Sequence, residues 1–163
     1  DDQGHKSVIR PNDVQVMSAG TGIVHSEHNN SADEPVNLLQ IWILPQAQAV
    51  SPRYAQYTFD PSTWHNQVAP LVTSQQQGGK LWINQQAVIA RTSLEPGKVV
   101  NYPLQSSDHG VYIFVMEGQV KVEGEVLNRR DAIGIEEVNQ LALQGVELCD
   151  VLLIEVPMQG PVA

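Results

Sequence analysis

The sequence predicts an all-β fold, and two observations carry this prediction. Short runs of alternating apolar and polar residues recur along the chain, separated by turn residues such as the Glu-Pro-Gly at positions 95–97. Helical 3.6-residue periodicity is not sustained anywhere for more than about ten residues. Many short strands with frequent turns are typical of a β-sandwich or a β-barrel.

A polar stretch with two glycines at residues 75–79 divides the predicted strands into two sets. In the first half, strands are predicted at residues 6–10, 14–17, 23–29, 37–44 and 54–59. In the second half, strands are predicted at residues 80–85, 88–94, 98–104, 110–117, 119–122, 125–127, 132–135, 140–143 and 147–156. We therefore expect a first unit over residues 1–59, a connector over 60–79 and a second unit over 80–163.

Residues 37–44 have the clearest strand pattern of the first half. Leu39, Ile41 and Ile43 share one face of an extended chain, because side chains alternate between faces. The opposite face carries Gln40 and Trp42 between two leucines. Both faces are mainly apolar, so this strand is predicted to be covered on both sides. Gln40 and Trp42 have two possible roles, lining a pocket or packing in the core, and the sequence pattern does not distinguish between them.

The connector is predicted to begin with a short helical turn. Asp60 precedes Pro61, and an aspartate N-cap followed by proline is a common helix start. The turn is expected to end at His65, with Trp64 as a packing residue.

The composition excludes several classes of partner. The net charge is −9, from 18 acidic and 9 basic residues, which disfavours nucleic acids and anionic membranes because both need clustered Lys and Arg. No signal peptide or apolar run of about 18 residues is present. The single cysteine, Cys149, cannot form an internal disulfide, is expected to be a buried small hydrophobe, and fits a cytoplasmic location.

Residues 18–29 contain the one close pair of metal-ligand type, His25 and Glu27. In an extended chain the two side chains project from the same face, with Cα atoms about 6.5 Å apart. An imidazole nitrogen and a carboxylate oxygen can then converge on one ion at about 2.0–2.2 Å each. Gly20 and Gly22 allow a tight turn before this pair. The other histidines lack this spacing and are interpreted as structural or surface residues: His5, His28, His65 and His109.

A longer series of residues surrounds this pair. It runs Asp1-x-x-Gly4, then Ile9-Arg10-Pro11-x-Asp13-Val14-Gln15-x-Met17-x-Ala19-Gly20-x-Gly22-Ile23-x-His25-Ser26-Glu27, and continues with Leu39-Gln40-Ile41-Trp42-Ile43 and Pro52-Arg53-Tyr54. This series resembles the pirin family, and is closest to bacterial pirin-like proteins described as quercetin 2,3-dioxygenases. The VMEGQVKVEG hairpin at residues 115–124 and the apolar strand before Pro157 resemble the family's second cupin.

The resemblance implies a bicupin, with two double-stranded β-helix barrels in one chain. In the family, a His-x-His and a His-x-Glu pair hold a divalent metal in the N-terminal barrel. His25 and Glu27 correspond to the second pair, whereas the first pair would precede the turn at which this sequence begins. We therefore expect an incomplete first barrel, two of four ligands, and metal held poorly or not at all by this chain alone. Fe(II) is the expected metal, with Ni, Cu, Co, Mn or Zn as alternatives, and no metal is expected in the second barrel.

The activity implied by the resemblance is dioxygenation of a flavonol-like substrate. Glu27 is then a catalytic residue that accepts the proton of a substrate hydroxyl, and Gln40 and Trp42 are candidate pocket residues. The alternatives are a non-enzymatic regulatory protein that binds partner proteins, and a cupin remnant without activity. An open first barrel also predicts self-association, strand exchange with another copy, or retention of a separate N-terminal fragment.

The resemblance also marks one departure. Asn12 stands where the family usually carries glycine, and asparagine tolerates the left-handed conformation that such a turn needs.

Overall fold

The structure, a computed structural model, describes residues 8–47 and 49–158. In this part of the chain the regular elements are strands and one short 3-10 helix, so the all-β prediction is confirmed. The elements are β1 (Asp13–Ser18), β2 (Arg53–Thr58), η1 (Pro61–Trp64), β3 (Ala69–Ser74), β4 (Trp82–Ile83), β5 (Val88–Leu94), β6 (Val99–Pro103), β7 (His109–Glu117), β8 (Val120–Val122), β9 (Glu125–Leu127), β10 (Ala132–Ile135), β11 (Gln140–Gly145) and β12 (Cys149–Pro157). No helix among these residues is long and apolar enough to cross a membrane.

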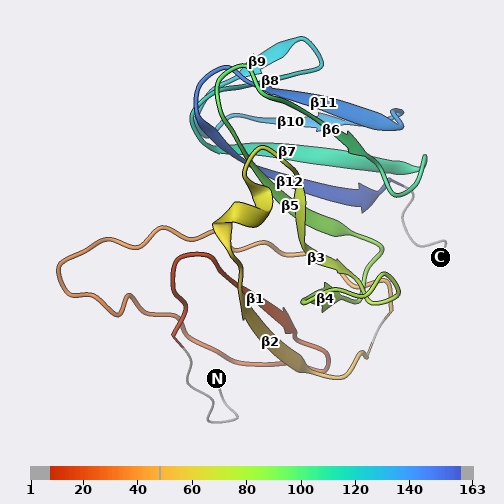
Figure 1. The fold of residues 1–163 in the computed structure, drawn as a ribbon. Coiled ribbons are helices and arrows are strands. Elements are labelled where there is room, and N and C mark those ends of the chain that lie inside the picture. Colours follow the sequence, from red (N-terminus) through yellow and green to blue (C-terminus); the bar gives the residue numbers. More distant parts are fainter. Residues whose placement is uncertain (1–7, 48, 159–163) are drawn as a thin grey trace.

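Two sheets dominate the C-terminal part of the fold (Figure 1). One has six strands in the order β10-β7-β12-β5-β3-β4, and the other has four in the order β6-β11-β8-β9. Strand β12 lies between β7 and β5, so that Leu153 pairs with Ile113 on one side and with Ala90 on the other. The last strand of the chain therefore closes the centre of the larger sheet.

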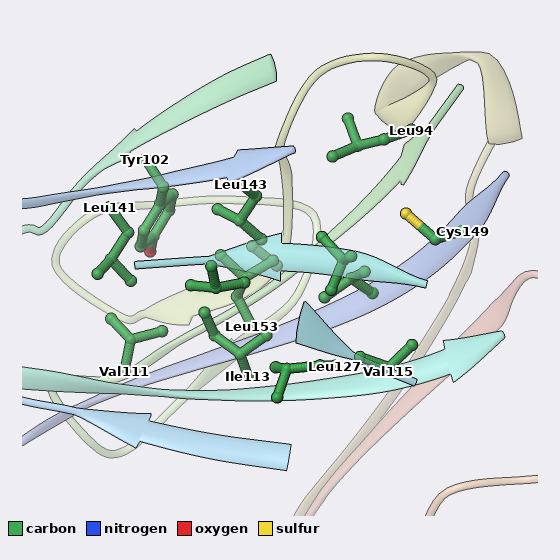
Figure 2. Close-up of a cluster of buried hydrophobic side chains, with 14 of the residues drawn as sticks. Leu94, Tyr102, Val111, Ile113, Val115, Leu127, Leu141, Leu143, Cys149 and Leu153 are labelled. Atoms are coloured by element: carbon green, nitrogen blue, oxygen red, sulfur yellow. The ribbon is translucent and has the colours of Figure 1, made fainter. Parts of the chain in front are cut away.

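The main core lies between these two sheets. Buried and less buried residues alternate along β5 and β11, because alternate side chains point into the core and away from it. Figure 2 shows aliphatic side chains of both sheets gathered there, including Ile113, Leu141 and Leu153, each 0% exposed. Burying one such side chain contributes about 1.5–3 kcal/mol, so this core is the main source of stability.

A second, smaller core joins the N-terminal strands to the larger sheet. Strands β1 and β2 pair antiparallel, and their inner side packs on β3 and β4. The buried side chains of this cluster are Val16, Trp64, Leu71, Val72 and Leu81. The guanidinium of Arg53 on β2 lies 3.9 Å from the Trp82 ring centroid and donates a hydrogen bond of 3.0 Å to the Trp82 carbonyl. The packing role predicted for Trp64 is confirmed.

Residues 19–52 differ most from the sequence prediction. The strands predicted at 23–29 and 37–44 are wrong, because neither segment pairs with any strand that the structure describes. Figure 1 shows this orange part of the chain as a wide loop that extends away from the sheets. The predicted strand at 6–10 is not formed over residues 8–10, and its first two residues lie outside the described ranges, as do Asp1, Gly4 and His5.

Most other local predictions are confirmed. The bounds of β5, β9 and β10 agree with the prediction, and Asp60 caps η1 by accepting a 2.9 Å hydrogen bond from the Ser62 backbone N–H. Asn12 has a positive φ of 70°, as its place in the turn required. The exceptions are β4, which is shorter than the strand predicted at 80–85, and β3, which was missed. Strand β3 lies in residues 60–79, which the sequence assigned to a connector; the unit boundaries themselves stay a prediction.

Candidate functional site

The chain turns sharply before the predicted metal pair. Strand β1 ends at Ser18, and the Gly22 N–H donates a 2.8 Å hydrogen bond to the Ala19 carbonyl. Gly20 has a φ of 55°, and a Cβ at this position would overlap the Val50 carbonyl oxygen and lie 2.9 Å from the Pro52 nitrogen. Glycine is therefore required at position 20, because the chain passes directly beside the segment that leads into β2.

His25 and Glu27 follow this turn, and both side chains are exposed. They lie in a segment without strand pairing, so the pleated backbone that was expected to aim them at one ion is absent. Neighbouring polar side chains bond locally: His28 Nε2 lies 3.2 Å from Ser26 Oγ, and the Asn29 amide donates to the Glu34 carbonyl at 2.7 Å. These contacts organise a surface loop and do not enclose His25 and Glu27.

The donor chemistry of the pair suits a divalent metal, but the number of donors does not. Imidazole and carboxylate are common ligands of divalent transition metals. No group of three or more His, Cys, Asp or Glu side chains that could hold an ion occurs within residues 8–47 and 49–158. A stable protein site usually has at least three protein ligands. The described residues by themselves therefore do not fit a resident metal.

The two candidate pocket residues also lie on the surface. Trp42 is 88% exposed, and Gln40 is exposed beside it. Their predicted role in binding a substrate stays a prediction.

The remaining histidines behave as structural or surface residues where the structure describes them. His65 is on the surface, with its Nε2 3.7 Å from a Glu95 carboxylate oxygen. His109 is 8% exposed, and its Nδ1 lies 2.7 Å from a carboxylate oxygen of Glu155.

Glu155 is the centre of a buried polar network in the C-terminal barrel. Its carboxylate is 0% exposed and faces three polar groups: the Tyr102 hydroxyl at 2.6 Å, the Gln105 backbone N–H at 2.7 Å, and His109. The two carboxylate oxygens thus meet polar groups from three separate parts of the chain, and such partners compensate the burial of a carboxylate. Burial, together with the hydrogen bond to Glu155 and its negative charge, raises the pKa of the Tyr102 hydroxyl.

Sequence reasoning did not identify this network, although one signal was visible. Glu155 is the charged residue in the run Val-Leu-Leu-Ile-Glu-Val of β12, and a carboxylate in a buried strand requires partners. Its acceptor capacity is used by Tyr102, Gln105 and His109, so the network supports the fold.

Two family profiles match separate parts of the chain. Residues 1–43 match the pirin profile, and residues 71–156 match the quercetinase C-terminal cupin domain. The chain belongs to the pirin family. The expected cupin architecture of this pirin is thereby confirmed, and the two-sheet barrel around the main core lies in the second match.

Comparison with individual proteins also places the chain in the pirin family. Quercetin 2,3-dioxygenase of Escherichia coli strain K12 is 30% identical over 157 residues, which cover 96% of this pirin and 66% of that protein. ZMO1337 of Zymomonas mobilis is 34% identical over 155 residues, which cover 94% of this pirin and 65% of that relative. This pirin therefore spans about two thirds of the length of these relatives.

Among solved structures, this pirin is similar to the bacterial pirin YhhW of Escherichia coli in complex with nickel(II). The TM-score is 0.86 at 29% sequence identity, and the match covers 98% of this chain and 66% of YhhW.

Proposed function

We propose that this pirin takes part in metal-dependent dioxygenation of a flavonol-like compound. One observation carries the proposal: His25 and Glu27, a ligand pair at i and i+2, lie inside the segment that matches the pirin profile. The 30% identity to a protein named quercetin 2,3-dioxygenase supports the reaction type. The nickel(II) in the YhhW complex supports a divalent ion, and Fe(II) is the ion that we expect here.

In this proposal Glu27 acts as the general base. Its carboxylate accepts the proton of a substrate hydroxyl, a general-base role that needs direct hydrogen-bond reach to that hydroxyl. A divalent metal, if His25, Glu27 and further ligands held it, would supply positive charge near that hydroxyl. Since the described residues provide two donors, further ligands have to come from residues outside those described or from another polypeptide.

Metal content and oxygen consumption test this proposal. After exhaustive dialysis we expect less than one metal ion per chain, because two exposed donors compete poorly with water. With quercetin and added Fe(II), we expect oxygen consumption, and Glu27→Gln should lower the rate at least about 100-fold, the usual size of a general-base contribution. His28→Ala, an exposed neighbour, is the matched control and should keep the wild-type rate.

Two outcomes would contradict the proposal. One is oxygen consumption that does not depend on added metal. The other is a wild-type rate for Glu27→Gln under conditions in which the His28→Ala control is fully active.

A second candidate function is that of a non-enzymatic interaction protein. The exposure of large apolar side chains in residues 36–44 favours it, because such side chains are more typical of contact surfaces than of free loops. A folded protein that consumes no oxygen with quercetin and Fe(II) would support this alternative over the enzyme. The cytoplasmic location stays a prediction for either function.

A further inference from the structure

The loop between β6 and β7 lies across one end of the C-terminal barrel. It leads from the four-stranded sheet to the six-stranded sheet, and Figure 1 shows it at the same end of the sheets as the tip of β12. Residues 105–108 of this loop have exposed side chains, and we call these residues the cover. The backbone of the cover contacts Glu155, whose carboxylate is 0% exposed although it lies near the end of β12. The cover therefore separates a buried ionisable side chain from solvent.

The cover is attached by hydrogen bonds and not by buried apolar side chains. The Gln105 backbone N–H donates to a carboxylate oxygen of Glu155 at 2.7 Å, and the Met158 N–H donates to the Asp108 carbonyl at 3.0 Å. The side-chain oxygen of Gln105 accepts a 2.9 Å hydrogen bond from the Gln77 amide, and both side chains are exposed. Segments with few buried apolar contacts and with solvent-exposed hydrogen bonds open at a lower free energy than the whole domain unfolds.

The interior behind the cover is polar. Tyr102 on β6, His109 on β7 and Glu155 on β12 meet there, and they are 7%, 8% and 0% exposed. When the cover moves away, water can take the place of the Gln105 N–H on the Glu155 carboxylate. Exposing polar groups to water costs much less than exposing aliphatic side chains. Opening is therefore less costly at this end of the barrel than it would be over an apolar interior.

We propose that the cover opens locally in the folded protein, with the Glu155 carboxylate as its latch, and that opening admits water and small solutes to Tyr102, His109 and Glu155. The ends of the moving segment are fixed. Before it, the Leu104 N–H donates to the Asn139 carbonyl at 3.0 Å, and after it, the pairing of β7 with β12 begins at His109. The strands therefore stay paired while the four residues of the cover move.

Amide hydrogen exchange, measured by NMR, tests the opening. We expect the Gln105 and Met158 amides to exchange at similar rates, at least about tenfold faster than the Leu153 amide between β5 and β7. Low concentrations of urea should accelerate exchange at Leu153 but hardly at Gln105, because local opening exposes little surface. Gln77→Ala removes one bond to the cover and should accelerate exchange at Gln105 about two- to tenfold. Gln76→Ala is the matched control: its side chain bonds to Gln86, outside the cover, so exchange at Gln105 should not change.

Labelling with diethyl pyrocarbonate, which modifies accessible imidazole nitrogens, tests the access. His109 should be labelled more slowly than His65, whose side chain is 51% exposed, and Gln77→Ala should accelerate labelling of His109 but not of His65. The proposal is overturned if Gln105 exchanges no faster than Leu153 and with the same urea dependence. It is also overturned if Gln76→Ala accelerates exchange at Gln105 as much as Gln77→Ala does, or if Gln77→Ala leaves the labelling of His109 unchanged.

Discussion

Replacement of Glu155 tests how much the buried network stabilises the C-terminal barrel. Glu155→Leu introduces an apolar side chain of similar size and removes the carboxylate that meets three polar partners. These partners belong to three different places in the fold: Tyr102 on β6, Gln105 in the following loop, and His109 at the start of β7. The variant therefore disturbs both sheets at once.

The expected cost follows from the number of bonds lost. Each hydrogen bond to an ionised group contributes about 1.5–3 kcal/mol, and buried donors left unpaired add a desolvation penalty. Part of this is recovered when water reaches the site, so we expect Glu155→Leu to lower the free energy of unfolding by about 3–5 kcal/mol. Glu155→Gln keeps one acceptor oxygen, and the Tyr102 hydroxyl can rotate to accept from the new amide. We expect this variant to lower the free energy of unfolding by about 1–2 kcal/mol, because its hydrogen bonds remain but no longer involve a charged group.

Urea unfolding at neutral pH, followed by tryptophan fluorescence, measures these differences. Glu125→Leu serves as the control, since Glu125 is an exposed glutamate on β9 and its replacement should change stability by less than about 0.5 kcal/mol. A Glu155→Leu variant as stable as the wild type would refute the reasoning. So would a Glu155→Gln variant less stable than Glu155→Leu.

Three further predictions concern pH, thiol reactivity and backbone geometry. Burial and Glu155 raise the pKa of the Tyr102 hydroxyl, so above about pH 10 the unfolded chain releases this proton while the folded chain keeps it. The free energy of unfolding should therefore fall as the pH rises, and it should fall less steeply in Tyr102→Phe. Urea unfolding at a series of alkaline pH values measures both slopes. Burial raises the pKa of the Cys149 thiol, so a thiol-specific reagent should label the native protein only as fast as it unfolds, and rapid labelling at neutral pH would contradict this. Gly118→Ala should lower the free energy of unfolding by more than about 3 kcal/mol, because φ is +75° and a Cβ would overlap the Leu148 carbonyl oxygen. Gly124→Ala should lower it by only about 1 kcal/mol, because φ is +92° but no atom lies within 4 Å of the added Cβ. Equal losses for the two variants in thermal unfolding would exclude the steric argument.

Local sequence pattern predicted the C-terminal barrel well. In strands such as β5 and β11 one face is buried and the other is less buried or exposed, so apolar and polar residues alternate and the strand is visible without its partners. The turn at Glu95-Pro96-Gly97 is likewise a local property: Gly97 has a φ of 79°, and the Lys98 N–H donates to the Glu95 carbonyl at 3.1 Å. Strand β3 was missed because Pro70 and its short apolar centre resemble a connector, although β5 and β4 pair with it.

The candidate site shows the limit of the same reasoning. The sequence alone determined that His25 and Glu27 are a ligand-type pair beside a glycine turn, and that residues 37–44 can form a strand. Whether such a segment becomes a strand depends on a partner that supplies hydrogen bonds, and the structure describes none for it.

Only the tertiary structure decided which distant residues meet. Tyr102 and Glu155 are 53 positions apart, and His109 and Glu155 are 46 apart, so no local pattern could pair them. The alternation of side chains is a property of a few consecutive residues and is readable in the sequence. The register between strands, which brings a buried carboxylate to its donors or leaves a ligand pair in solvent, is set by the packing of the whole chain.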